Sequence, residues 1–248
     1  MSETRDYQTR TINVGGVRTD ADIDQGLRSY MLKVYNLMAL GVALTGLVAY
    51  AFAEMAGTRQ ALTPFGVAIY TSPLKWAILL APIALVFFLS FRIEKMSAFA
   101  AQVTFWIFAA LMGASLSSIF LVYTDASIVK TFAVTAATFG ALSLYGYTTK
   151  RDLSAMGTFM IMGLFGLIIA SLVNLFLKSS ALDFAVSVIG VLVFAGLTAW
   201  DTQRIKEMYA ESAGFEAINK MAIMGALNLY MDFINLFLFL LRFMGNRE

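Results

Sequence analysis

The chain contains no cysteine and no histidine. Disulfides, the common kinds of zinc site, catalytic cysteines, serine–histidine pairs and imidazole pH switches are therefore excluded. Charged residues are also scarce: they make up 14% of the 248 residues, whereas soluble domains carry roughly 25%. Any acid–base or cation chemistry must rest on carboxylates, amides, hydroxyls and the backbone.

The balance of charge adds a second exclusion. The formal net charge is only +2, and no block of five or more basic residues occurs, so the sequence predicts no nucleic-acid partner. Hydrophobic residues are abundant instead, at 59% of the chain. This composition is typical of a protein that crosses the membrane several times, with the lipid bilayer as its first partner.

Seven stretches are long and apolar enough to cross roughly 30 Å of hydrocarbon. They lie near residues 33–53, 75–92, 98–123, 128–147, 157–177, 181–200 and 219–243. The connections are short, which favours antiparallel neighbours in one bundle. We therefore expect an all-α membrane protein with a polar cytosolic N-terminal arm at residues 1–30 and a domain of seven transmembrane helices at residues 31–248.

The distribution of Lys and Arg predicts the orientation of this bundle. Basic residues are concentrated in the arm and in the loops after the second, fourth and sixth spans, and the remaining loops hold few. The positive-inside rule then places the N-terminus in the cytoplasm. Seven crossings leave Arg242 and Arg247 on the outside, so a last segment that enters the membrane and returns remains an alternative.

The last span carries a carboxylate near its middle. Asn228, Asp232, Asn235 and Arg242 fall at helical spacings and share one stripe. A charge at this depth almost always faces a protein interior or water, because its exposure to lipid is costly. The last helix is therefore expected at the centre of the bundle. A polar ladder that fixes the helix register is one interpretation, and a functional carboxylate is the one we favour.

A second acid, Asp201, lies at the end of the sixth span, one turn after Thr198 and one turn before Arg204. It is either an interfacial residue satisfied by its own helix or the partner of Asp232, since the two spans are neighbours in sequence. Two carboxyl groups within hydrogen-bonding distance do not both ionise cheaply, so such a pair shares a proton and titrates as a unit. In a chain without histidine, this pair is the obvious pH sensor.

Arg92, at the end of the second span, is a possible third member of the site. A guanidinium holds a carboxylate well, and the expected topology puts Arg92 at the same end of the bundle as Asp201. As a latch, it would pair with ionised Asp201 and release the acid when that acid is protonated. The alternative is an anchor at the membrane surface, together with Lys95.

Two stretches of the chain resemble a known family. They are "AVTAATFGALSLYGYTTKRDLS" (133–154) and "LNLYMDFINLFLFLLRFMG" (227–245), and with the seven-span layout they are similar to the Bax inhibitor-1 family, also called the transmembrane Bax inhibitor motif family. The N-terminal arm resembles that of bacterial members, which implies the inner membrane. The resemblance implies a seventh helix wrapped by the other six, and a pH-sensitive calcium leak gated by Asp201 and Asp232 with Arg92 as the latch.

A calcium site made by this chain is expected to be weak. Calcium prefers six to eight oxygen ligands, and Asp201 and Asp232 with nearby amides and hydroxyls, such as those of Asn228, Asn235 and Thr198, suit transient binding. We therefore expect calcium as a permeant ion, protons as its regulator, no cofactor and no enzymatic activity.

The sequence is also compatible with other functions. The main alternative is a non-channel regulator that binds other membrane proteins, such as a quality-control protease. An intramembrane aspartyl protease also needs two aspartates on adjacent spans, but its Tyr-Asp and Gly-x-Gly-Asp patterns are missing here, because Asp201 follows Trp200 and Asp232 follows "NLYM". A retinal protein would need a lysine inside the last span, and that span has none.

Overall fold

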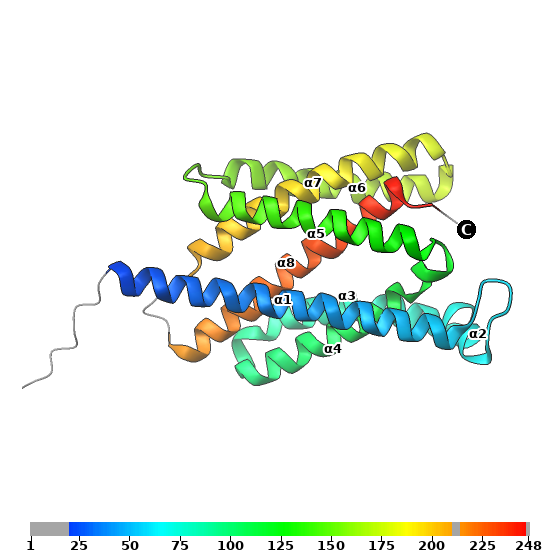
Figure 1. Cartoon of the computed structure of the whole chain (residues 1–248), viewed down its shortest axis with the longest axis horizontal. Coiled ribbons are helices and arrows are strands. Elements are labelled where there is room, and N and C mark those ends of the chain that lie inside the picture. The colour runs from blue at the N-terminus through cyan, green and yellow to red at the C-terminus, as the bar shows by residue number, and fades with distance from the viewer. Residues whose placement is uncertain (1–19, 210–213, 247–248) are drawn as a thin grey trace, which may run out of the picture.

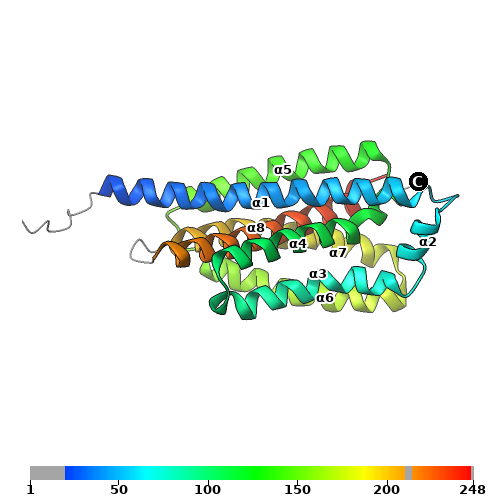
Figure 2. The same cartoon turned by 90° about the horizontal axis from the view of Figure 1, so that it is seen from below.

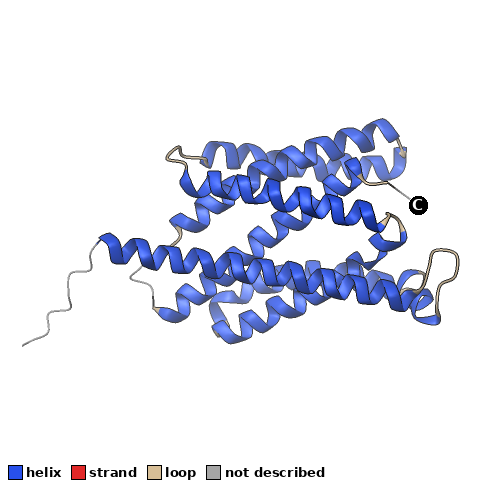
Figure 3. Ribbon diagram, in the orientation of Figure 1, coloured by secondary structure: helices blue, strands red, loops and turns tan. Residues whose placement is uncertain are grey.

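The computed structural model describes residues 20–209 and 214–246, which form helices joined by short loops (Figure 3). Two short 3-10 helices, Ile93–Lys95 and Ser117–Leu121, follow the second and third long helices. The α-helices are α1 (Asp20–Ala56), α2 (Pro64–Tyr70), α3 (Leu74–Arg92), α4 (Ala98–Leu116), α5 (Asp125–Thr148), α6 (Ser154–Leu177), α7 (Ser180–Glu207) and α8 (Phe215–Met244).

All of these helices except α2 are long and apolar enough to cross a membrane, which gives seven spans in the described residues. Each expected span falls on one of them, so the prediction of an all-α membrane protein with seven transmembrane helices is confirmed. Except for α4, the helices are longer than the apolar runs. In particular, α1 begins at Asp20 and includes residues 20–30 of the expected arm. The rest of that arm, residues 1–19, lies outside the described residues.

Hydroxyl residues mark where the spans begin. Ser97, Thr124 and Ser179 precede α4, α5 and α7, and each accepts a hydrogen bond from the backbone N–H three residues later. Such caps satisfy N–H groups that have no partner inside the helix. The end of α6 is marked differently, by Lys178 in a left-handed conformation with φ 48°. Local chemistry therefore sets the turns between spans.

Helix α8 is the most buried span. Inside the bundle, 67% of its most apolar window is buried, against at most 39% for the other spans. It packs against α1, α4, α5 and α7. The remaining two spans, α3 and α6, lie outside this layer against α4 and α7 (Figure 2). Helix α8 therefore has four close neighbours, whereas six were expected. The other two spans are outer helices whose apolar side chains face lipid.

The two ends of the described chain lie at opposite ends of the bundle (Figure 1). Helix α8 is continuous, and the segment after it contacts the start of α5: Asn246 N donates to Ser127 Oγ at 2.9 Å, and Thr124 N donates to Asn246 O at 3.2 Å. A last segment that enters and returns is therefore wrong, because α8 runs the length of the bundle.

Basic residues gather at the end where α1 begins, together with the loops after α3, α5 and α7 (Figure 1). We call this the basic end, and its described cations are Arg28, Lys33, Arg92, Lys95, Lys150, Arg151, Arg204, Lys206 and Lys220. Here Gln203 joins α7 to the loop after α5: its Oε1 accepts from Leu153 N, and its Nε2 donates to Arg151 O, both at 2.8 Å.

An aromatic cluster fixes α8 against α1 and α4. Tyr230 is fully buried, and its ring meets those of Phe105 and Phe108 edge-on, with centroids 6.1 Å and 5.2 Å away. Its hydroxyl lies 2.7 Å from that of Thr45, which also donates to Ala109 O at 2.8 Å. Since Tyr230 is two residues before Asp232, this cluster holds the part of α8 that carries the carboxylate.

Candidate functional site

Asp201 of α7 and Asp232 of α8 face each other inside the bundle. Their carboxyl groups are hydrogen-bonding partners and act on each other electrostatically. Their exposed fractions are only 9% and 4%. The Oδ2 atom of Asp232 is buried and has no hydrogen-bond partner in the described part of the chain. The packing of α7 on α8 thus brings together the two acids that the sequence singled out.

The other polar residues of the expected site are used locally. The Thr198 hydroxyl donates to Phe194 O at 2.7 Å, and the Asn235 amide donates to Met231 O at 2.8 Å. Both groups are therefore satisfied by their own helices. Asn228 lies half-buried one turn before Asp232. The two carboxyl groups consequently depend mainly on each other.

The structure does not bring Arg92 to the acids. Arg92 is exposed at the end of α3, and no hydrogen bond or ion pair joins it to Asp201 among the described residues. The reason is that α3 packs on α4 and lies away from α7. The expected pairing is therefore not formed in this structure, and the assignment of Arg92 as a latch has no contact behind it.

The positive charge that acts on Asp201 comes from Arg204, one turn later on the same helix. Its guanidinium carbon lies 5.3 Å from the ring centroid of Trp200, which is a cation–π distance. The three-residue spacing from Asp201 was the available signal for this contact. On that spacing alone, Asp201 was expected to be an interfacial residue satisfied by its own helix.

An ion pair closes the opposite end of the same two helices. Arg242 of α8 pairs with Asp183 in the first turn of α7. Both side chains are partly exposed, at 32% and 30%. Arg242 lies on the same stripe as Asp232, but helical spacing alone could not identify its partner. The Arg242–Asp183 ion pair and the contact between Asp201 and Asp232 therefore join α7 to α8 at two levels of the bundle.

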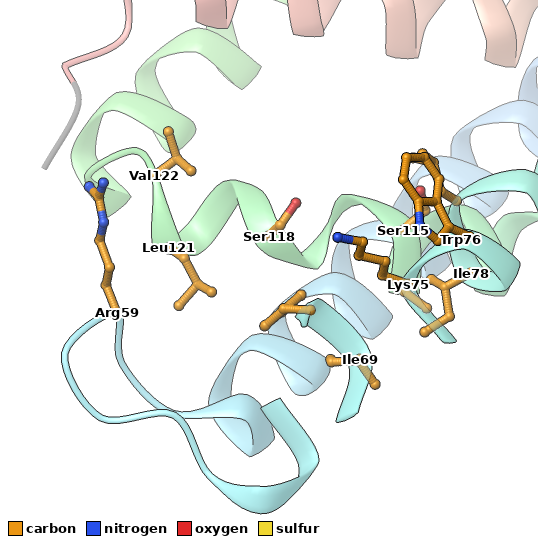
Figure 4. Close-up of a pocket in the computed structure, with 12 residues that line it drawn as sticks. Arg59, Ile69, Lys75, Trp76, Ile78, Ser115, Ser118, Leu121 and Val122 are labelled. Atoms are coloured by element: carbon orange, nitrogen blue, oxygen red, sulfur yellow. The ribbon is translucent and has the colours of Figure 1, made fainter. Parts of the chain in front are cut away.

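A hollow of about 420 Å³ lies near the end of the bundle opposite the basic end, between α2, α3 and α4 (Figure 4). Arg59 and Lys75 approach it from two sides, and Ser115 and Ser118 line its wall. Burial raises the pKa of Tyr70, which also lines the hollow and donates to Ser117 Oγ at 2.9 Å. No carboxylate lines this hollow, so it does not suit a cation.

The aspartate pair is the only buried carboxylate pair in the described residues, and no group of three or more acidic residues placed to hold a metal ion occurs there. Two carboxylates provide at most four oxygens, fewer than calcium prefers. The pair can attract a cation, hold a proton between its members, or exchange one for the other.

The fold and this site define a class: an α-helical membrane protein with a buried carboxylate pair on its last two spans. The family model described as inhibitor of apoptosis-promoting Bax1 matches residues 27–248. The chain therefore belongs to the Bax inhibitor-1 family, and the resemblance found in the sequence is confirmed.

Several bacterial relatives match most of the chain. Protein RP147 of Rickettsia prowazekii is 53% identical over 227 residues, which cover 91% of this chain and 92% of the relative. The inner membrane protein YbhL of Escherichia coli (strain K12) is 50% identical over 225 residues, with 90% and 94% covered. The membrane protein SpyM3_0260 of Streptococcus pyogenes is 36% identical over 230 residues, with 91% and 96% covered.

Proposed function

We propose that this protein is a passive calcium leak of the bacterial inner membrane, controlled by protons at Asp201 and Asp232. The single observation that supports this proposal is the pair itself: two acids from adjacent spans face each other inside an apolar bundle. An ion pair that stabilises a fold joins opposite charges. Asp201 and Asp232 instead carry like charges when both are ionised, so they repel each other and do not stabilise the bundle. A role in cation passage gives a reason for it.

The proposed orientation follows from charge and from a relative. YbhL is named as an inner membrane protein, and the basic end of the bundle is expected to face the cytoplasm under the positive-inside rule. Asp201 then lies toward the cytoplasmic side on α7, with Asp232 near the middle of α8. Calcium passing between them would be held transiently, because the ion obtains few protein oxygens and keeps part of its water shell.

Flux through the purified protein tests this proposal. We expect liposomes that contain the protein and an enclosed calcium dye to take up calcium faster than protein-free liposomes, and faster still as the pH falls and the pair becomes protonated. Protonation removes negative charge from the pair, which releases Asp201 from the attraction of the neighbouring cation. Flux equal to that of empty liposomes at every pH would reject the leak and favour a regulator that binds other membrane proteins.

The structure also predicts which arginine matters for that attraction. We expect Arg204→Gln to raise the leak at neutral pH by about fivefold, the effect of a coupling of roughly 1 kcal/mol, because the charge of Arg204 acts electrostatically on Asp201. Arg92→Gln is the matched control and should change the flux little. The same assay measures both variants. A larger effect of Arg92→Gln would restore Arg92 as the latch and mean that the conducting state differs from this structure.

A further inference from the structure

A groove of about 650 Å³ runs between α1 and α5. Both helices pack on α8, and they lie side by side on one face of the bundle (Figures 1 and 2). The residues that line the groove all lie on these two helices: Arg28, Met31, Leu32, Tyr35, Met38, Ala39, Phe139, Gly140, Ser143, Leu144 and Tyr147. It therefore opens sideways on the bundle, where a membrane protein meets lipid.

The groove has a polar mouth and an apolar interior. Because α1 and α5 run antiparallel (Figure 1), Arg28 and Tyr147 both lie toward the basic end of the groove, whereas Ala39 and Phe139 lie toward its far end. The distance from Arg28 to Ala39 is about three turns of helix, or roughly 16 Å. One leaflet of hydrocarbon is roughly 15 Å thick, so a groove of this length takes a headgroup and the upper part of an acyl chain from one leaflet.

The mouth of the groove is positively charged. Arg28 lines it, and Lys206 reaches it from α7: its Nζ donates to Tyr147 O at 2.9 Å and lies 5.3 Å from the centroid of the Tyr147 ring. Lys150 and Arg151 are exposed in the loop just beyond α5. No acidic residue lines the groove. This charge is complementary to the phosphate of an anionic lipid headgroup.

A buried hydroxyl without a partner lies one turn deeper. Ser143 is only 4% exposed, and its Oγ has no hydrogen-bond partner in the described part of the chain although its residue lines the groove. Ser143 lies one turn of α5, roughly 6 Å, below Tyr147. This depth is close to the roughly 5–7 Å that separates the headgroup surface of one leaflet from its hydrocarbon. The ester carbonyls of a glycerophospholipid would lie at this level and accept a hydrogen bond from Ser143 once its side chain rotates toward the groove.

We propose that the groove between α1 and α5 binds an anionic glycerophospholipid. One acyl chain lies along Met38, Phe139 and Gly140, and the headgroup phosphate is held by Arg28 and Lys206 at the basic end. A Cβ built on Gly140 meets no atom within 4 Å, so this glycine leaves the space that the chain fills. The proposal concerns a lipid site and does not depend on the calcium leak.

Gly140→Leu provides the test, because the new side chain enters open space in the groove and does not strain the helix. The full-length protein is purified in a mild detergent, phosphatidylglycerol or phosphatidylcholine is added, and bound lipid is counted by native mass spectrometry. We expect the wild type to retain phosphatidylglycerol in preference to phosphatidylcholine, and Gly140→Leu to reduce that retention about tenfold by occupying the volume of the chain.

Two further variants make the result specific. Gly166→Leu on α6 is the matched control, since a Cβ there also meets no atom within 4 Å and Gly166 lies outside the groove; it should bind lipid like the wild type. Arg28→Gln, at an exposed position, should reduce the preference for phosphatidylglycerol about fivefold, the effect of one cation near an anionic headgroup, while the retention of phosphatidylcholine stays unchanged.

The same spectra can overturn the proposal. Equal retention of the two lipids by the wild type, or unchanged retention of phosphatidylglycerol by Gly140→Leu, would show that the groove is not the site. Displacement of phosphatidylglycerol by millimolar inorganic phosphate alone would mean that only the basic mouth binds. A second copy of the chain bound in place of lipid, seen as a dimer that Gly140→Leu disrupts, would make the groove a protein interface.

Discussion

The Asp232→Asn variant should leak calcium at a rate that barely changes with pH, whereas we expect the wild-type rate to change about tenfold between about pH 5 and about pH 8, equivalent to ~1.4 kcal/mol. Asparagine keeps the shape of the side chain and its hydrogen bond to Asp201, but it carries no exchangeable charge. The proton shared by two acids is then lost, and Asp201 is left facing a neutral amide. The measurement is dye-reported uptake into liposomes over a pH series.

Asp152→Asn is the control for this variant. Asp152 is an exposed acid in the loop after α5, far in sequence from both aspartates, and hydrogen bonds from the Ser154 hydroxyl and N–H lower its pKa. It therefore stays ionised across the tested range, and its removal should leave the pH profile unchanged. A wild-type profile in Asp232→Asn, or a flattened profile in Asp152→Asn, would show that the pH response originates elsewhere.

The seven spans and the charge at each end could be predicted because both depend on short stretches of sequence. An apolar run of about 20 residues crosses the hydrocarbon whatever its neighbours are, and basic residues between runs gather at one end once the runs alternate in direction. The contact of Asp201 with Asp232 was also within reach, since their helices are consecutive and antiparallel. Helix α2 was missed because a seven-residue helix outside the spans has no such signature.

The lateral order of the helices could not be predicted in the same way. No hydrophobic force brings helices together in lipid, so small residues and close packing decide which helices meet. Gly146 illustrates this: a Cβ there would lie 2.1 Å from the carbonyl oxygen of Ala199, and only glycine allows α5 to approach α7 so closely. The expected pairing of Arg92 with Asp201 is not formed among the described residues for this reason, because Arg92 would reach the acid only if α3 packed beside α7.

The aromatic cluster around Tyr230 should be the most sensitive structural element of the bundle. We expect Tyr230→Ala to lower the melting temperature of the detergent-solubilised protein by about 10 °C, from a loss of roughly 3–5 kcal/mol at ~2–4 °C per kcal/mol. The cause is the loss of ring contacts with Phe105 and Phe108. The cavity that alanine leaves between the helices removes these van der Waals contacts. Such contacts hold helices together in lipid, where no hydrophobic force drives their association.

Tyr230→Phe separates the ring from the hydroxyl. This variant keeps both aromatic contacts and loses only the hydrogen bond to Thr45, 2.7 Å long, so the melting temperature should fall by about 3 °C, the effect of ~1 kcal/mol. The loss should be small because Thr45 still donates to backbone carbonyls of α1 and α4. If Tyr230→Ala melted within ~3 °C of the wild type, α8 would not be held by this cluster, and the position of Asp232 would depend on its contacts with α7.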